Sequence, residues 1–155
     1  MIYEWDDGMK IGYTEIDAQH KGLFDFMSGF FSSSGGRMER EEVEKILDYL
    51  EAYTQVHFSD EERIQVENNY PGYTQHKRYH EEFKIVVRGL RADLEREGPT
   101  PELIAQIDMA VGSWLVDHIQ TQDMKIGNHI RDVQRWREQM EVLRAANMRQ
   151  YQAQE

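Results

Sequence analysis

The histidines of this chain are spaced so that several of them could bind a metal ion together. His76 and His80 are four residues apart, so on a helix both side chains project from one face. His57 and Glu61 have the same spacing. Taken alone, each pair is more often a surface contact than a metal site, and so the pairs have to be judged together.

The histidines share one further property, which is that each long segment carries one beside apolar residues. His20 lies at helical spacing from Ile16 and Leu23, and His118 lies beside Trp114 and Leu115. Burying several imidazoles in one core is unfavourable unless something binds them. Together with the nearby carboxylates, the candidate metal ligands are His20, His57, Glu61, His76, His80, His118 and Asp123.

The composition of this ligand set narrows the choice of metal. Five imidazoles and two carboxylates are too many for one tetrahedral zinc ion, whereas calcium and magnesium prefer oxygen ligands. The chain has no cysteine, which excludes thiolate sites and iron–sulfur clusters. Imidazole with carboxylate suits iron. With about six positions on each of two irons, the seven side chains and a bridging oxide or hydroxide leave about one position for a small molecule.

Four segments with helical periodicity must position these residues. Clusters of Ser, Gly, Asn and Pro interrupt the chain near 32–36, 68–72 and 98–101, and nothing alternates with the two-residue period of a strand. Thr14 and Thr100 are expected N-caps. The helices are expected near 15–31, 39–67, 73–97 and 101–127. This pattern predicts an all-α protein, an up-down-up-down four-helix bundle with a C-terminal extra helix.

The spacing of two ligands on the last of these helices predicts a local irregularity. Asp123 follows His118 by five residues, which on an ideal α-helix leaves the two side chains ~140° apart. Both must nevertheless reach one site. A π-type widening of the helix between them would bring them together.

The C-terminal segment, residues 129–155, differs from the rest of the chain. Residues 1–128 hold 13 basic and 25 acidic side chains, whereas the C-terminal segment holds five basic and four acidic ones. We expect the bundle to end at a helix stop at Gly127 and Asn128. Apolar residues then recur with a and d spacing at Val133, Trp136, Met140 and Leu143. The C-terminal segment either folds back, with Trp136 covering an apolar groove, or pairs with a second subunit or a partner.

Composition limits the classes of partner. A chain of 155 residues is expected to form one domain, and its net charge of −11 argues against nucleic acid and anionic membranes as partners. No apolar run approaches the ~20 residues of a spanning helix, and the N-terminus has no signal-peptide pattern. We therefore expect a cytoplasmic protein without membrane contact, a monomer or small homo-oligomer.

Four short motifs, one in each expected helix, carry all of the candidate ligands. They read Ile16-Asp17-Ala18-Gln19-His20, His57-Phe58-x-x-Glu61-Glu62, His76-x-x-x-His80-x-x-Phe83 and Trp114-Leu115-x-x-His118-Ile119-x-x-x-Asp123. In this order they resemble the hemerythrin family, specifically the bacterial hemerythrins. The resemblance runs from about Trp5 to Ile126 and fills all seven ligand positions of the family.

The resemblance implies a role for each ligand. His76, His80 and His118 would hold one iron, while His20 and His57 would hold the second iron, which keeps the open position. Glu61 and Asp123 would bridge the two irons. The positions that line the family's oxygen pocket are filled by Leu23, Phe58, Trp114, Leu115 and Ile119.

The function implied by the resemblance is reversible binding of dioxygen, for storage, delivery or sensing. The ligand set agrees, because imidazoles compensate less positive charge than carboxylates do and so disfavour the oxidised states needed for hydroxylation. The protein is therefore expected not to be an enzyme. One alternative is a di-iron enzyme that handles peroxide or nitric oxide at the same site, and another is an iron or oxygen sensor. His129, the sixth histidine, is expected at the surface.

Overall fold

Helices make up most of the chain in the computed structural model, which describes residues 4–33 and 38–152. A short 3₁₀ turn, η1 (Asp7–Met9), precedes three long helices, α1 (Thr14–Ser33), α2 (Arg40–Glu67) and α3 (Tyr73–Glu97). The fourth helical run consists of α4 (Pro101–Met109), η2 (Ala110–Leu115), α5 (Val116–His118), η3 (Ile119–Asp123) and α6 (Met124–Gln152).

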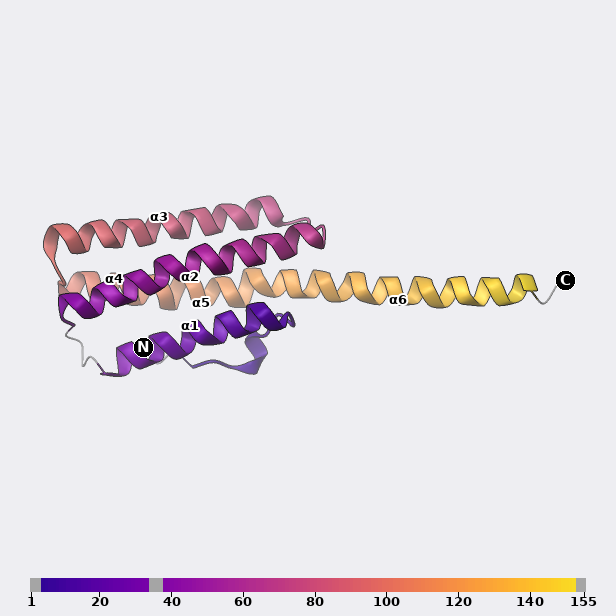
Figure 1. Cartoon of the computed structure of the whole chain (residues 1–155), viewed down its shortest axis with the longest axis horizontal. Helices are drawn as coiled ribbons and strands as arrows, with labels where there is room; N and C mark the ends of the chain where they lie inside the picture. Colours follow the sequence, from indigo (N-terminus) through magenta and orange to yellow (C-terminus); the bar gives the residue numbers. More distant parts are fainter. Residues whose placement is uncertain (1–3, 34–37, 153–155) are drawn as a thin grey trace.

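The four helical runs lie side by side, and each runs antiparallel to the one before it (Figure 1). The expected up-down-up-down bundle is confirmed, and the first three helices match their expected ranges to within two residues. The hydroxyl of Thr100 accepts a hydrogen bond from the backbone N–H of Leu103, as expected of an N-cap. Thr14 is instead itself the first residue of α1.

The fourth helical run does not stop where the sequence predicts. Gly127 lies inside α6, which continues to Gln152, so the expectation of a stop at Gly127 and Asn128 and of a separate helix after it is wrong. A Cβ atom on Gly127 would lie 2.2 Å from the carbonyl oxygen of Ile11. The glycine therefore serves a close approach of two backbones and not the end of a helix.

The close approach at Gly127 fixes the N-terminal segment, residues 4–13, to the bundle. The carboxylate of Asp17 accepts hydrogen bonds from the backbone N–H groups of Ile11 and Gly12, at 2.8 and 3.1 Å. The guanidinium of Arg131 donates to the carbonyl oxygen of Ile11 at 2.7 Å. These bonds supply partners for the N–H groups of Ile11 and Gly12 and the carbonyl of Ile11, which lie outside any helix and have no partner within one.

The second half of α6 extends beyond the other helices and away from the bundle (Figure 1). Among the residues that the structure describes, Ile130 is the last buried one of α6, and Arg131 is the last to donate a hydrogen bond to the N-terminal segment. The indole of Trp136 is 61% exposed. The interpretation in which the C-terminal segment folds back and Trp136 covers a groove is therefore wrong. Contacts with the bundle also continue about three residues past the expected boundary at residue 128.

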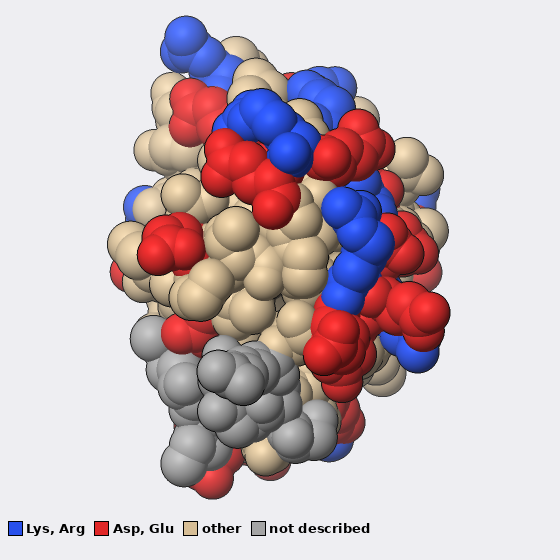
Figure 2. Space-filling model, turned by 90° about the vertical axis from the view of Figure 1, so that its left-hand side faces the viewer, with Lys and Arg blue, Asp and Glu red and all other residues tan. Residues whose placement is uncertain are grey.

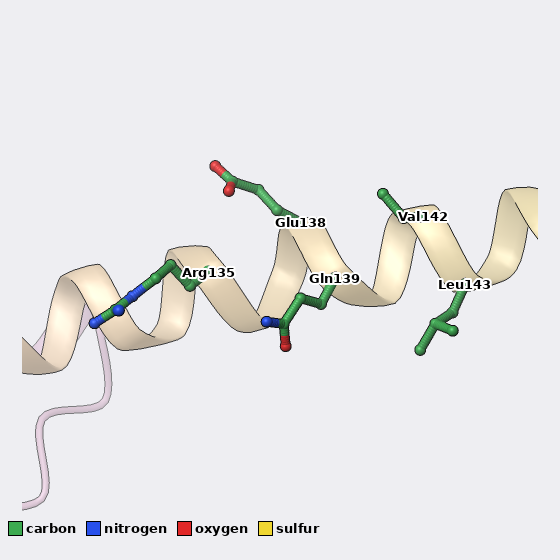
Figure 3. Close-up of a pocket in the computed structure, with 5 residues that line it drawn as sticks. All are labelled: Arg135, Glu138, Gln139, Val142 and Leu143. Carbon is green, nitrogen blue, oxygen red and sulfur yellow. The ribbon is translucent and has the colours of Figure 1, made fainter.

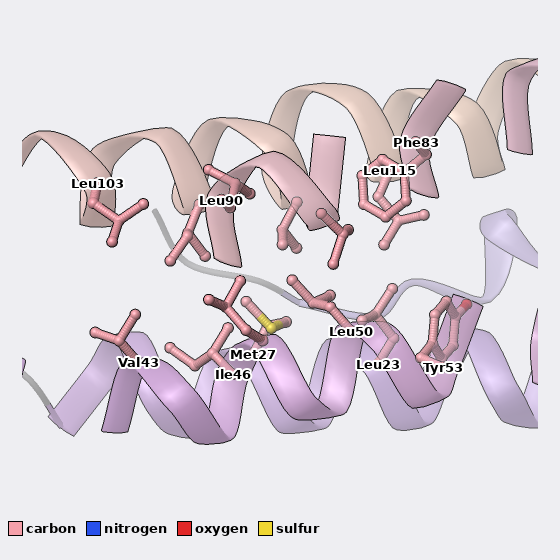
Figure 4. Close-up of a cluster of buried hydrophobic side chains, with 14 of the residues drawn as sticks. Leu23, Met27, Val43, Ile46, Leu50, Tyr53, Phe83, Leu90, Leu103 and Leu115 are labelled. Atoms are coloured by element: carbon pink, nitrogen blue, oxygen red, sulfur yellow. The ribbon is translucent and has the colours of Figure 1, made fainter. Parts of the chain in front are cut away.

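Two apolar clusters fill the bundle at different heights. The larger one, part of which is shown in Figure 4, extends from the α2 start to the middle of the bundle and contains Leu23, Val43, Leu50, Phe58, Leu115 and Ile119 among others. The smaller one consists of Ile11, Ile16, Ile64, Ile126 and Ile130. Along α1, α2 and the fourth helical run, the candidate ligands lie between residues of the two clusters.

Charged residues of both signs surround the bundle end where α3 ends and α4 begins (Figure 2). Many are paired locally, as where Arg96 contacts Asp93 and Glu97 at 2.6 and 2.8 Å. Among the described residues, no helix is long and apolar enough to cross a membrane. Most charged side chains lie outside, whereas the interior holds the apolar clusters, five histidines and the two buried carboxylates of Glu61 and Asp123.

Candidate metal centre

The fold brings all seven candidate ligands together in the interior, and each side chain is at most 5% exposed. Their ligand atoms form two groups, and within each group all ligand atoms lie within 4.8 Å of one another. The three-histidine group consists of Glu61, His76, His80 and His118, and the two-histidine group of His20, His57, Glu61 and Asp123. Glu61 belongs to both.

Within the three-histidine group, the Nε2 atoms converge on one point. His76 Nε2 lies 3.0 Å from His80 Nε2 and 3.1 Å from His118 Nε2. The carboxylate of Glu61 is equally close, with Oε2 2.9 Å from His76 Nε2. The ring of His76 is thus surrounded by three other ligand atoms at hydrogen-bond distance.

Asp123 connects the two groups with its two oxygens. Its Oδ1 lies 3.1 Å from His118 Nε2 and 3.3 Å from His76 Nε2, whereas its Oδ2 lies 3.2 Å from His20 Nε2. Within the two-histidine group, the Nε2 atoms of His20 and His57 are 3.2 Å apart. One oxygen of the carboxylate therefore faces each group of histidines.

These contacts fit metal ions better than they fit a protein hydrogen-bond network. One imidazole N–H can bond to one acceptor at a time, yet His76 Nε2 has several atoms within reach. Both carboxylate oxygens of Asp123 and Oε1 of Glu61 are buried without a hydrogen-bond partner. If two ligand atoms each lie about 2.1 Å from one metal ion and their bonds to it form a right angle, the two atoms are about 3 Å apart. The distances in this centre have this value.

The helix that carries His118 and Asp123 is irregular where the sequence predicts it. The segment Ile119–Asp123 is a π-helix, η3, between the α-helical α5 and α6. Hydrogen bonds from residue i to residue i+5 let five residues make about one turn, so both side chains face the same interior point. The expected widening is confirmed. A second π-helix, η2, was not predicted.

Two polar residues next to the ligands orient imidazole rings. Gln19 Oε1 lies 2.8 Å from His57 Nδ1, and Glu62 Oε1 lies 3.0 Å from His80 Nδ1. Both bonds engage Nδ1 and leave Nε2 toward the centre, which is how proteins usually fix a metal-binding histidine. The motifs contain both residues, but neither was predicted to have this role.

The five predicted pocket residues belong to the larger apolar cluster or pack against it, and two of them stack on histidines. Leu23, Phe58, Leu115 and Ile119 are buried in the larger apolar cluster, and Trp114 packs partly buried against it. The ring of Phe58 stacks on His80 with 3.8 Å between centroids, and Trp114 stacks on His118 at 4.7 Å. The centre therefore has an apolar wall on this side.

Comparison with known proteins places the chain in a family. Residues 11–130 match the Hemerythrin HHE cation binding domain family. The chain belongs to the hemerythrin family. It is 36% identical to a myohemerythrin of Sipunculus nudus over 123 residues, which cover 79% of this chain and 89% of the relative. A myohemerythrin of Theromyzon tessulatum is 32% identical over the same shares. A bacteriohemerythrin of Stenotrophomonas maltophilia is 27% identical over 82% of this chain and 80% of its own length. No solved structure matches the chain significantly.

The charge states in this hemerythrin-family centre suit cation binding. Burial, with repulsion from His20, lowers the pKa of His57 to about 3, so its ring is neutral at pH 7. Burial and the charge of Asp123 raise the pKa of Glu61, but hydrogen bonds from His76 and His80 outweigh them and lower it to about 2. Glu61 is therefore ionised. A neutral His57 and an ionised Glu61 are in the forms that bind metals. Burial lowers the pKa of His80, but its hydrogen bonds to Glu61 and Glu62 outweigh burial and raise it, so a metal at this ring would take the place of a proton.

His129 lies outside both ligand groups, and from the sequence we expect it at the surface. It is nevertheless half-buried and not freely exposed. Its Nε2 lies 2.9 Å from the carbonyl oxygen of Asn68, and its ring packs edge-on against Tyr70. Its role in this hemerythrin-family fold is to hold the loop between α2 and α3 against α6.

Proposed function

We propose that this protein binds two iron ions at the buried centre, with a bridging oxide or hydroxide, and that it reversibly binds dioxygen there. Two of the relatives compared above carry the name myohemerythrin and one the name bacteriohemerythrin. The observation that carries the proposal is the position of Asp123, whose two oxygens face the two groups of histidines. A carboxylate placed in this way suits a pair of metal ions.

The proposed ligand assignment follows the two groups. His76, His80 and His118 would hold one iron, His20 and His57 the other, and Glu61 and Asp123 would bridge them. The second iron has one protein ligand fewer, so the open position would lie beside His20 and His57. Imidazole with carboxylate is a donor set that suits iron.

The remaining residues prepare the centre for reversible binding. Bound iron would supply the electrons that dioxygen accepts. Gln19 and Glu62 hold the rings of His57 and His80 in place. The apolar wall of Leu23, Phe58, Trp114, Leu115 and Ile119 would exclude water from a small ligand in the pocket. Excluding water slows the loss of a charged ligand.

An optical experiment distinguishes this function from the enzymatic alternative. The iron-loaded protein is reduced without oxygen, exposed to air, and then degassed. Reversible binding predicts a visible charge-transfer band that appears in air and disappears on degassing, over several cycles. A di-iron enzyme acting on peroxide or nitric oxide would instead consume its substrate repeatedly and would not return dioxygen. Loss of the band without release of dioxygen would contradict the proposal.

For the C-terminal segment, we propose a separate role in pairing with a second copy of this chain. Met140 and Leu143 are turned by about 80° and 140° around the helix from Ile130, so their stripe does not continue the bundle-facing side. Leu143 is 56% exposed. In a parallel pair, Asp132 would lie opposite Arg137 of the second copy, which is a favourable charge contact.

Two neighbouring apolar residues provide a matched test of this pairing. Leu143 lies in the stripe of a and d positions, whereas Val142, which is 69% exposed, lies outside it. Both line a shallow hollow along α6 whose walls come from this one helix (Figure 3). Leu143→Glu should convert a dimer to a monomer in light scattering, and Val142→Glu should not. A wild-type monomer, or equal effects of the two variants, would contradict the proposal.

A further inference from the structure

A row of four polar side chains runs through the interior on α2. Tyr53, His57, Glu61 and Gln65 follow one another at four-residue spacing, and all four are buried. The two inner residues belong to the candidate metal centre. The two outer ones have polar atoms without any hydrogen-bond partner, the hydroxyl of Tyr53 and both amide atoms of Gln65.

The unpartnered hydroxyl of Tyr53 is unfavourable for the folded protein by itself. Tyr53 is 8% exposed and its hydroxyl oxygen is buried, so bulk water does not reach it. A buried tyrosine hydroxyl is normally hydrogen-bonded, and leaving it unpaired costs stability. At neutral pH the hydroxyl carries its proton and can donate it to an acceptor. The fold therefore holds a hydrogen-bond donor for which it supplies no acceptor.

Tyr53 lies on the side of the centre where a small ligand would bind. Its ring stacks on that of His57, with 4.7 Å between centroids and 24° between planes. It belongs to the same buried cluster as the predicted pocket residues, and Figure 4 shows it beside Leu23 and across the core from Leu115. Gln65, at the other end of the row, follows Ile64 of the smaller cluster.

We propose that the hydroxyl of Tyr53 donates a hydrogen bond to a small oxygen- or nitrogen-donor ligand in the pocket beside His20 and His57. This inference rests on the proposed function and adds a ligand-binding residue to it. A ligand that gains negative charge on binding benefits most, because hydrogen bonds to charged acceptors are the stronger ones. Tyr53 thus contributes to the affinity of the pocket for dioxygen and for anions of similar size.

Azide binding to the oxidised, iron-loaded protein tests this inference. Tyr53→Phe should weaken azide binding about tenfold, which is the loss of one hydrogen bond to an anion, while two irons per chain are retained. Tyr49→Phe is the matched control, because Tyr49 is half-buried one turn earlier and its ring stacks on Phe26 at 3.7 Å. It should leave the azide affinity unchanged.

A second readout needs no metal at all. In the metal-free protein, Tyr53→Phe should melt at the same temperature as wild type or higher, because it removes an unpaired buried hydroxyl. Unchanged azide affinity in Tyr53→Phe at full iron content, or a lower melting temperature of the metal-free variant, would overturn the inference. Wild-type protein that binds neither iron nor azide would instead overturn the proposed function, and this inference with it.

Discussion

Gly127 is the position where the structure makes its sharpest quantitative prediction. On helix propensity alone, Gly127→Ala should stabilise α6 by about 1 kcal/mol. The added Cβ, however, would lie 2.2 Å from the carbonyl oxygen of Ile11, at 2.9 Å from its carbonyl carbon and at 3.0 Å from its Cα. These are backbone atoms, which cannot move aside as the end of a flexible side chain can.

The loss of stability in Gly127→Ala can be estimated from how far the N-terminal segment must move. Ordinary contacts between carbon and oxygen begin at about 3.3 Å, so the N-terminal segment has to retreat by about 1 Å. Overpacking of this kind costs about 1–3 kcal/mol. The hydrogen bond from Arg131 to the same carbonyl, 2.7 Å long, would weaken and cost about 1.5 kcal/mol more. After subtraction of the helix propensity of about 1 kcal/mol, we expect a net loss of about 1.5–3.5 kcal/mol.

A matched glycine provides the control. Gly89 lies inside α3, and a Cβ on it would meet nothing within 4 Å. Gly89→Ala should therefore raise the melting temperature by about 2–4 °C, whereas Gly127→Ala should lower it by about 5–10 °C. Both are measured by thermal unfolding of the metal-free protein. Stabilisation by both substitutions would refute the packing of the N-terminal segment on α6.

Three further predictions concern the metal centre. His118→Ala and His57→Ala should both lower the iron content. Under the proposed assignment only His57 would hold the iron with the open position, so the azide affinity per retained iron should fall more in His57→Ala than in His118→Ala. Removing iron with a chelator should lower the melting temperature, because a ligand that binds only the folded state at a thousandfold excess over Kd contributes about 4 kcal/mol; equal melting temperatures would contradict this. Glu62→Gln should weaken iron retention about 10- to 100-fold in chelator competition, since Glu62 orients His80.

Much of the fold could be predicted from the sequence because its signals are local. Helical periodicity and the Pro and Gly clusters defined α2 and α3 to within a residue. The π-helix after His118 was predicted because two ligands five residues apart must face one point. The second π-helix, η2, carries no such pair and so left no signal.

The errors at the C-terminal end have one physical cause. Gly127 was interpreted as a helix stop because glycine often ends helices, whereas its actual role depends on Ile11, more than a hundred residues earlier. A contact between residues so far apart in the sequence cannot be predicted from the residues that neighbour either one. The same holds for Tyr53, whose missing hydrogen-bond partner is apparent only once its surroundings are known.

The metal content of the purified protein tests the central claim most directly. Two clusters of ligand atoms that share Glu61, with Asp123 between them, could each hold one metal ion, and the proposed function assigns two irons to each chain. Elemental analysis after growth with ample iron and zinc should therefore give close to two irons per chain and little zinc. One iron per chain, or zinc in preference to iron, would contradict the assignment of a di-iron centre.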